Sequence, residues 1–391
     1  MLKILFISSH LNPFEQTRGG DAQRTNLLLR ACAGLGVVDV VVFQKDVLSD
    51  IPNCNVIYSQ DVVSVEQSKK TRWSKWLPFL QFWSAEALFK RNKCKTTIVK
   101  TIIEKNIYDF IVVRYIPKAM ECGLLDYANK LVVDVDDLPE DEFRIFARDA
   151  RTISGRIRNS LFSYLAKWNT KQILDKVKFS FFANPEQVYK QNAAYLPNIP
   201  FYEQFVCKDI DFNHTPKRLF FIGDLNYYPN YMGINYFLEQ IYKPLQQKID
   251  DVEFCIAGKI SDLELKGRWE TYPNVRILGY VEDIVAAYTN SRVVVVPIFQ
   301  GAGTNIKLLE AMQMNRACVV SDFATRGFST IFKDETDYCV ARNDKEYTEK
   351  IELLLTDELK NKTIAHNGSI KVKKYFSFTS FSTIVKQAFK N

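Results

Sequence analysis

The segment VVVVPIFQGAGTNIKLLEAMQMNRACVVSDFATRGF, residues 293–328, decides the fold of this chain. Its four valines predict a buried strand, and the glycine loop at 301–304 leads into a helix that carries Glu310. A second β-rich run, ACVVSD, follows this helix, and Arg326 and Gly327 mark a further turn. Strands that alternate with helices in this way indicate a parallel sheet covered by helices.

The same segment predicts a ligand. A glycine loop that enters a helix offers backbone N–H groups and the positive end of the helix dipole, which together suit a phosphate. Glu310 adds a carboxylate that can accept hydrogen bonds from the hydroxyls of a ribose or a sugar. A glycine loop alone is weak evidence, but here a strand and a helix flank it. The segment therefore predicts a nucleoside-diphosphate ligand, and a nucleotide sugar fits it best.

The composition is that of a globular protein of 391 residues, with 47% hydrophobic and 25% charged residues. This length accommodates two domains of ordinary size. No run approaches the ~18 apolar residues of a membrane-spanning helix. The first apolar run, LKILFISS, predicts a strand rather than a signal peptide, so we expect a cytoplasmic protein.

The numbers and positions of the cysteines, histidines and aspartates show which metal sites the chain could form. Eight scattered cysteines without a CxxC pair predict reduced, mostly buried thiols rather than a disulfide or zinc framework. Three histidines are too few for a histidine-rich metal site. Asp134, Asp136 and Asp137 end a predicted strand, where they face a cleft, cap the next segment or bind a divalent metal. We favour the cleft-facing role and expect no metal.

Basic residues concentrate in the N-terminal half, because the net charge of +7 arises entirely within residues 1–200. Residues 67–105 hold ten lysines and arginines against two acidic residues, with six interleaved aromatic side chains, Trp73, Trp76, Phe79, Phe82, Trp83 and Phe89. A second basic stretch, residues 144–178, contains Arg148, Arg151, Arg156, Arg158, Lys167 and Lys171 with Phe162, Tyr164 and Trp168. Such stretches suit an anionic membrane surface, unless the aromatic rings pack inward above an ordinary solvated face. No nucleic-acid-binding module is recognisable, so nucleic acid is not an expected partner.

Apolar runs separated by helical stretches divide the chain into two series. The N-terminal series, with a helix near 22–34, comprises KILFISS, VVDVVVF, NVIYS, YDFIVVRY, KLVVDVD and FSFFAN. The C-terminal series, with helices near 231–247 and 283–290, comprises RLFFIGD, VEFCIAGK, VRILGYV, RVVVVPI, CVVSD and YCVA. We therefore expect an α/β protein of two doubly wound domains, joined near 197–216, with ligands bound beyond the carboxyl ends of the strands.

Several motifs carry a resemblance to a known family: GAGTNIKLLEAM, ACVVSD, LFFIGDLNYYPNYMGINYF, FCIAGK, VRILGYVED and Asn198 in LPN. The chain resembles glycosyltransferase family 4, the retaining nucleotide-sugar-dependent transferases of GT-B fold. The resemblance covers nearly the whole chain and is most specific over 196–328. It implies two Rossmann-like domains facing an interdomain cleft, an acceptor-side domain over 1–197 and a donor-binding domain over 198–375. A C-terminal helix over 376–391 would pack back toward the first domain.

The resemblance also implies roles for single residues. Glu310 would bind the donor ribose, and the donor set as a whole would be Gly223, Lys259, Gly279, Tyr280, Gly301, Gly303, Thr304, Asn305 and Glu310. The acceptor side would be formed by His10, Gly19, Gly20 and Arg24. A structural role is the alternative for His10, and a solvated position is the alternative for Arg24. The catalytic roles would fall to Asp136, Asp137 and Lys307.

Three positions depart from the family pattern. Ala302 stands where many members have the first of two glutamates. No cation follows Gly223, so the usual diphosphate clamp is absent or is replaced by Lys259, Lys307 or Arg326. Asp136 and Asp137 stand where members often have a histidine, which gives an aspartate the acceptor-facing role.

These features together predict a retaining glycosyltransferase of the hexosyltransferase type. It would move a sugar from a nucleoside-diphosphate sugar to a glycan or lipid-linked glycan, in cell-surface polysaccharide or glycoconjugate synthesis. It would need no cofactor and would be peripheral on the cytoplasmic face of the membrane. Two alternatives are open: a nucleotide-sugar epimerase, and a non-catalytic partner in glycan assembly, which the missing clamp and Ala302 would suit.

Overall fold

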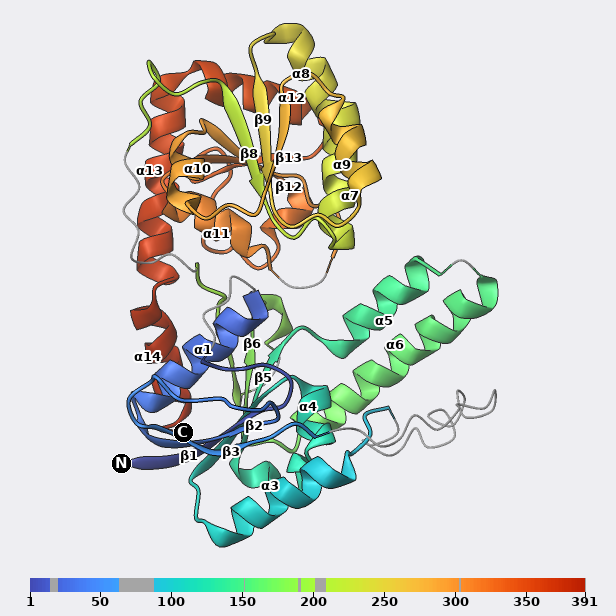
Figure 1. Ribbon diagram of the computed structural model, residues 1–391, viewed down its shortest axis with the longest axis vertical. Helices are drawn as coiled ribbons and strands as arrows, with labels where there is room; N and C mark the ends of the chain where they lie inside the picture. The colour runs from blue at the N-terminus through green and yellow to red at the C-terminus, as the bar shows by residue number, and fades with distance from the viewer. Residues whose placement is uncertain are drawn as a thin grey trace. The chain divides into compact units, whose positions relative to one another are not determined.

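The computed structural model describes residues 1–14, 20–62, 88–150, 152–188, 191–200, 209–301 and 304–390 (Figure 1). The chain forms two compact units. Unit 1 comprises Met1–Pro197 together with Phe381–Asn391, and unit 2 comprises Asn198–Ser380. Each unit is built around its own parallel β-sheet, so the predicted fold class of two Rossmann-like α/β domains is confirmed.

The sheet of unit 1 has the strand order β3-β2-β1-β4-β5-β6-β7, and every neighbouring pair is parallel. Its central strands are buried on both faces, as expected for runs rich in valine and isoleucine. The strands are β1 (Leu2–Ser8), β2 (Gly36–Val42), β3 (Cys54–Ser59), β4 (Phe110–Arg114), β5 (Leu131–Asp136), β6 (Phe179–Phe182) and β7 (Ala193–Tyr195).

The helices of unit 1 pack on this sheet or extend from it (Figure 1). α1 contacts β1 and β2, and α4 contacts β4 and β5. The helices are α1 (Gly20–Ala33), α3 (Lys93–Lys105), α4 (Ile116–Glu121), η2 (Leu124–Lys130), α5 (Pro139–Arg148), α6 (Ile153–Leu174) and η3 (Pro185–Gln187). The chain ends in α14 (Phe378–Ala388), after which the ring of Phe389 packs 4.6 Å from that of Phe110 in β4.

The sheet of unit 2 has the order β10-β9-β8-β11-β12-β13, again with parallel neighbours throughout. β11 consists of the four valines at 293–296, and all four are buried. The strands are β8 (Arg218–Ile222), β9 (Glu253–Ala257), β10 (Val275–Gly279), β11 (Val293–Val296), β12 (Ala317–Ser321) and β13 (Cys339–Ala341).

Unit 2 is helix-rich, and one of its helices changes type along its length. α7 (Tyr228–Phe237) continues through a π-helical turn, η4 (Leu238–Tyr242), into α8 (Lys243–Lys248). Pro244 near the start of α8 lacks the N–H that a regular helix would use, which accounts for the wider turn before it. The other helices are α9 (Leu263–Glu270), α10 (Ile284–Thr289), α11 (Ile306–Gln313), η5 (Asp322–Thr325), α12 (Asp344–Thr356) and α13 (Glu358–Tyr375).

The strand order reverses at one point in each sheet, between β1 and β4 in unit 1 and between β8 and β11 in unit 2. In doubly wound sheets, ligands bind outside the carboxyl ends of the strands at such a reversal. His10 and Tyr115 follow the two strands at the reversal in unit 1, while Gly223 and Gly301 follow those in unit 2. The topology therefore predicts ligand-binding sites at these two edges.

Candidate active site

At the carboxyl edge of the unit 2 sheet, the backbone segments that follow neighbouring strands lie very close to one another. Gly258, after β9, has φ +143°, and a Cβ there would lie 1.7 Å from the carbonyl oxygen of Gly223, after β8. Its N–H donates to the carbonyl of Gly279 at the end of β10 over 2.7 Å, and Gly279 has φ +66°. At Gly258 only glycine fits, because both its φ and the contact with Gly223 oppose a Cβ. The predicted residues Gly223 and Gly279 therefore share one edge with Gly258, which was not predicted, and this edge carries backbone polar groups instead of side chains.

The loop before α11 leaves the start of that helix without a side-chain cap. Asn305 is the N-cap residue, but its amide donates to the carbonyl of Ala324 over 3.4 Å and makes no capping bond to the helix. The hydroxyl of Thr304 accepts a hydrogen bond from the amide of Asn198 over 3.1 Å. The N–H groups of Ile306 and Leu308 already donate to the carbonyls of Thr304 and Asn305 over 3.1 and 3.0 Å, so this helix start offers an anion mainly the positive end of its dipole. The predicted residue Gly303 lies outside the described residues.

Lys307 and Asn230 form a pair that the sequence analysis missed in part. The Lys307 ammonium donates to Oδ1 of Asn230 over 3.2 Å, and the amide of Asn230 donates to the carbonyl of Asp224 over 2.7 Å. Asn230 is buried, and a Cβ on Gly223 would lie 2.8 Å from its amide nitrogen. Burial lowers the pKa of Lys307 to about 8, while Glu310 opposes that shift. The motif YYPN places Asn230 after Pro229 in the first turn of α7, which was the only sequence signal for it.

The other predicted donor residues lie around this pair. Glu310 is half-buried and stands three residues after Lys307, on the same side of α11. Arg326 reaches the carbonyl of Gly301 over 3.4 Å and stacks on the ring of Phe323. Lys259 and Tyr280 are exposed, two residues after the end of β9 and one residue after the end of β10. Of the three cations considered for the clamp, Lys307 and Arg326 therefore lie at the glycine loop and its helix.

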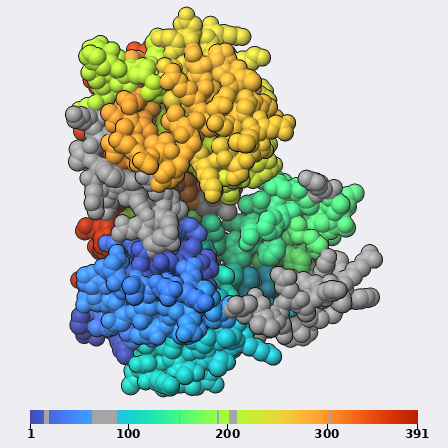
Figure 2. Space-filling model, in the orientation of Figure 1, coloured from blue at the N-terminus to red at the C-terminus, as the bar shows by residue number. Residues whose placement is uncertain are grey.

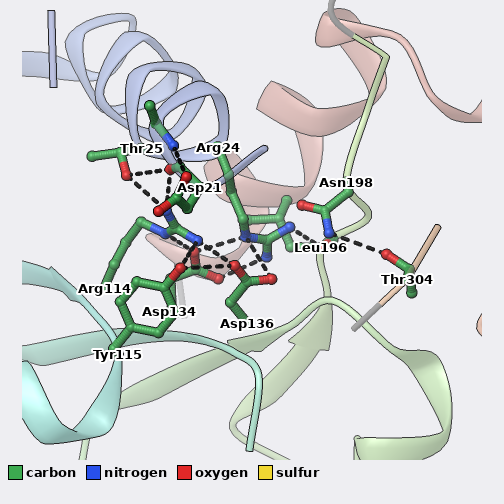
Figure 3. A network of polar contacts seen from close by, with 11 residues as sticks. Asp21, Arg24, Thr25, Arg114, Tyr115, Asp134, Asp136, Leu196, Asn198 and Thr304 are labelled. Atoms are coloured by element: carbon green, nitrogen blue, oxygen red, sulfur yellow. Dashed lines mark hydrogen bonds and ion pairs between the residues drawn. The ribbon is translucent and has the colours of Figure 1, made fainter. Parts of the chain in front are cut away.

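The carboxyl edge of unit 1 holds a network of arginines and aspartates (Figure 3). Arg24 makes a bidentate ion pair with Asp134, with distances of 2.8 and 2.7 Å, and donates to the carbonyl of Leu196 over 2.9 Å. Arg24 is 1% exposed and Asp134 is completely buried. The solvated alternative for Arg24 is therefore wrong, because its guanidinium is turned inward, while its acceptor-side role stays a prediction.

Arg114 links this buried pair to Asp136. Its Nε donates to Asp134 over 2.9 Å, and its other nitrogens bond to Thr25, Tyr115 and Asp136 (Figure 3). Burial alone would raise the pKa of Asp134, but Arg24 and Arg114 outweigh it and lower that pKa. Asp134 is consequently a structural anion that fixes two arginines rather than a group open to substrate.

Asp136 and Asp137 lie at the surface end of this network. Asp136 has φ +54°, and Tyr115, whose hydroxyl is 3.3 Å from it, has φ +68°. Residues other than glycine seldom adopt such angles, which recur at functional sites. Asp137 is exposed, yet the protein around it and then the charge of Asp136 raise its pKa to about 7. Asp137 is thus open to solvent, whereas the Asp136 carboxylate is 12% exposed and pairs with Arg114, and the acceptor-facing role of both stays a prediction.

His10 belongs to the same edge. Its ring packs against Tyr115 with centroids 5.3 Å apart, and its Nδ1 is buried without a hydrogen-bond partner. Burial, followed by the charges of Lys118 and Arg114, lowers the pKa of His10 to about 4, so the imidazole is neutral at pH 7. Gly20 is the first residue of α1, and Gly19 lies outside the described residues. Within the described ranges no group of three or more His, Cys, Asp or Glu side chains is placed to hold a metal ion.

The two basic stretches differ in how much of them the structure describes and in which aromatic side chains are exposed. In the first, residues 63–87, including Trp73, Trp76, Phe79, Phe82 and Trp83, lie outside the described residues. Phe89 is buried in the core of unit 1, so its predicted place at a membrane is wrong. In the second stretch, Tyr164 and Trp168 are exposed on α6, whereas the ring of Phe162 stacks on Phe143. Throughout the described parts of the chain, no helix combines the length and apolar character needed to cross a membrane.

Part of the chain is similar in sequence to known glycosyltransferases. Residues 216–357 match the family model of glycosyl transferases group 1. The capsular polysaccharide biosynthesis glycosyltransferase CapM of Staphylococcus aureus is 34% identical over 106 residues, which span 27% of this chain and 27% of CapM. An uncharacterized 44.6 kDa protein in the cps region of Klebsiella pneumoniae is 23% identical over 411 residues, covering 99% of this chain and all of that protein.

Solved structures extend the glycosyltransferase likeness to the whole fold. Sucrose-phosphate synthase from Thermosynechococcus elongatus has a TM-score of 0.68 at 15% identity, covering 100% of this chain and 98% of that chain. Anabaena HepE in complex with UDP and glucose has a TM-score of 0.62 at 13% identity, covering 100% of both chains. Staphylococcus aureus TarM, in a complex that includes UDP, has a TM-score of 0.64 at 11% identity, covering 100% of both chains. At these identities the likeness shows the fold, which is GT-B; together with the family model it supports a GT-B glycosyltransferase.

Proposed function

We propose that this protein transfers a sugar from a nucleoside-diphosphate sugar to a hydroxyl of a glycan or lipid-linked glycan. The observation that carries the proposal is the arrangement at α11, where a glycine loop, an uncapped helix start, Lys307 and Glu310 lie within the matched glycosyltransferase region. Unit 2 would bind the donor, and the edge of unit 1 with Asp136 and Asp137 would bind the acceptor. The likeness to CapM favours a role in cell-surface polysaccharide synthesis.

In the proposed reaction, the bond between the anomeric carbon and the diphosphate oxygen breaks. Negative charge then grows on the leaving diphosphate, and donors fixed in advance stabilise such charge most effectively. The start of α11 supplies the positive end of its dipole, Lys307 supplies an ammonium, and Arg326 lies beside the same loop. These groups would replace the cations that are missing after Gly223. No metal is required in this proposal.

We further propose that the reaction retains the anomeric configuration, as in family 4. The acceptor hydroxyl would add to the anomeric carbon on the side from which the diphosphate leaves, and the diphosphate oxygen would take its proton. The neutral His10 and the exposed Asp137 would orient the acceptor rather than act as strong bases. We also propose that the protein acts at the cytoplasmic face of a membrane, since its basic excess lies in the acceptor-side unit.

A second candidate function is a non-catalytic partner in glycan assembly. Ala302 in place of a glutamate and the lack of a cation after Gly223 favour it. An epimerase is less well supported, because such enzymes usually rely on acid–base groups around the sugar and the chain has only three histidines. Analysis of the products formed without an acceptor separates an epimerase from a transferase.

The first test is a thermal-shift screen against UDP-, GDP-, ADP- and CDP-sugars. UDP-glucose comes first, because crystal structures of HepE contain UDP and UDP-glucose. A donor at ~100 times its Kd should stabilise the protein by about 2.7 kcal/mol. Stabilisation by one base, followed by release of the nucleotide in the presence of an acceptor, supports the proposal. Absence of binding by every donor in calorimetry would favour the non-catalytic partner.

A further inference from the structure

The solvent face of α6 carries a continuous row of apolar side chains. Five residues form it, with spacings of four, four, three and four, and we call them the α6 stripe: Ile153, Ile157, Leu161, Tyr164 and Trp168. Their exposed fractions run from 42% for Leu161 to 80% for Ile153. This spacing places all five on one side of a helix. Single exposed apolar residues are normal, but a contiguous row over four turns marks an interaction surface.

The stripe is not needed to hold α6 in place. The opposite side of the helix is buried through Leu165, Ala166, Ile173 and Leu174. Hydrogen bonds also tie α6 to α5: the Asn159 amide donates to the Phe146 carbonyl over 3.0 Å, and the Ser163 hydroxyl donates to the Glu140 carbonyl over 2.9 Å. The stripe is therefore apolar surface in excess of what the fold requires.

The charges on α6 indicate which kind of partner would bind the α6 stripe. α6 contains no acidic residue, and three exposed cations each lie one turn from a stripe residue: Arg156, Lys167 and Lys171. A symmetric pairing of two α6 stripes would bring these like charges together without a carboxylate on α6 to offset them. An anionic bilayer offers phosphates to the cations and an apolar layer to the stripe. Tyr164 and Trp168 suit the boundary between headgroups and hydrocarbon.

The position of the helix pair connects this surface to the proposed acceptor edge. α5 begins at Pro139, two residues after Asp137, so the pair continues directly from the end of β5. In Figures 1 and 2 the pair, coloured green, extends from the rest of unit 1 as an arm. A surface bound along α6 would therefore be linked through one short segment to the aspartates at the edge of the sheet.

We propose that the α6 stripe and its three cations dock this protein on an anionic lipid bilayer. The choice of a lipid surface rests on the proposed function, since a lipid-linked acceptor resides there. The apolar residues enter the headgroup layer, and the cations select an anionic surface. Docking is a binding event that does not depend on turnover, so it is measured separately from sugar transfer.

The test is co-sedimentation of the full chain with vesicles. One set contains equal parts of phosphatidylglycerol and phosphatidylcholine, and the other contains phosphatidylcholine alone. The stripe variant is Ile157→Glu with Leu161→Glu, and the charge variant is Arg156→Gln with Lys167→Gln and Lys171→Gln. The matched control is Leu359→Glu, an exposed leucine of α13 in unit 2. Circular dichroism and melting curves verify that each variant is folded.

We expect the wild type and Leu359→Glu to bind anionic vesicles at least tenfold more tightly than phosphatidylcholine vesicles. The stripe variant should lose at least tenfold in binding, and the charge variant should lose its preference for the anionic lipid. Wild-type chain that stays in the supernatant, or a folded stripe variant that binds as wild type does, overturns the proposal. A wild-type dimer that the stripe variant dissociates, without vesicle binding, also overturns it. Vesicle binding by a chain that binds no donor would refute the proposed function and leave the docking intact.

Discussion

At the scale of single residues, the proposed chemistry depends on Lys307 and Glu310. They lie three residues apart on α11 and so present an ammonium and a carboxylate on one side of the helix. Asn230 holds the ammonium of Lys307 from the neighbouring helix α7. An ammonium suits a diphosphate, and a carboxylate suits the hydroxyls of a ribose or a sugar. Each of these assignments gives a measurable consequence.

Replacement of Glu310 by alanine should weaken donor binding. Hydrogen bonds to a charged group contribute about 1.5–3 kcal/mol, so the donor KM should rise roughly tenfold to a hundredfold. Steady-state kinetics over a range of donor concentrations measures this, with Glu349→Ala on the exposed side of α12 as the control. Unchanged donor KM and unchanged transfer in Glu310→Ala would show that the assignment of this residue is wrong.

Donor binding should depend on pH through Lys307. Its pKa is lowered to about 8, so the ammonium is charged below that pH and becomes neutral as the pH rises through it. Donor affinity should therefore fall above pH 8. Asn230→Ala, which removes the oxygen that accepts from the ammonium, should move this fall to lower pH. Calorimetric titrations between pH 6 and 10 measure it, and a flat profile in both proteins would exclude Lys307 as a phosphate ligand.

Arg24 should matter for stability rather than for acceptor binding. Arg24→Met would leave the buried Asp134 carboxylate with Arg114 as its remaining partner, and loss of one member of a buried ion pair costs about 3 kcal/mol. Urea unfolding measures this loss, with Arg30→Met on the same helix as the control. A variant with wild-type stability and a raised acceptor KM would contradict this and support the acceptor-side role predicted from the sequence.

At the scale of elements, the donor edge of unit 2 depends on where its strands end. Glycines follow β8 and β9 directly, and a glycine ends β10. Their backbones lie close together, because the N–H of Gly258 donates to the carbonyl of Gly279 and its Cα lies against the carbonyl of Gly223. This close approach removes side chains from the edge, and the loop before α11 completes it. A nucleotide bound at this edge would therefore contact mainly backbone groups, so the side chains around it would not indicate which base the nucleotide carries.

Gly258→Ala should disrupt this edge. Its φ of +143° and the carbonyl 1.7 Å from the added Cβ both oppose any side chain, so we expect a loss of more than about 3 kcal/mol in the free energy of unfolding. Gly267→Ala in α9 is the matched control, because nothing lies within 4 Å of its Cβ. That change should stabilise the helix by about 0.5–1 kcal/mol. Chemical denaturation of both variants tests the contrast, and equal stabilities would contradict it.

At the scale of the whole molecule, the sequence predicted the fold well because its strands are local apolar runs. β11 and β12 could be read from four valines and from ACVVSD without knowledge of their neighbours. β7 gave no such signal, since it has three residues at the edge of the sheet. Its pairing with β6 depends on tertiary context that no short pattern records.

The candidate site was predictable only in part, for the same physical reason. The glycine loop and Glu310 are contiguous in sequence, so their pattern is visible. The burial of Arg24 depends on Asp134, which lies 110 residues away, and the pairing of Lys307 with Asn230 spans 77 residues. Such long-range pairs arise from packing and leave no local pattern. Likewise, the basic and aromatic residues near Trp168 were noticed, but the full stripe depends on which side of α6 is buried.

The central claim is that the chain uses a nucleoside-diphosphate sugar as a donor. The most direct measurement is nucleotide release from the panel of UDP-, GDP-, ADP- and CDP-sugars, with a glycan or lipid-linked acceptor, for the wild type and Glu310→Ala. The account predicts acceptor-dependent release from at least one donor, with the product keeping the anomeric configuration, and a large loss in the variant at subsaturating donor. Folded wild-type protein that neither binds nor cleaves any donor of the panel would contradict it.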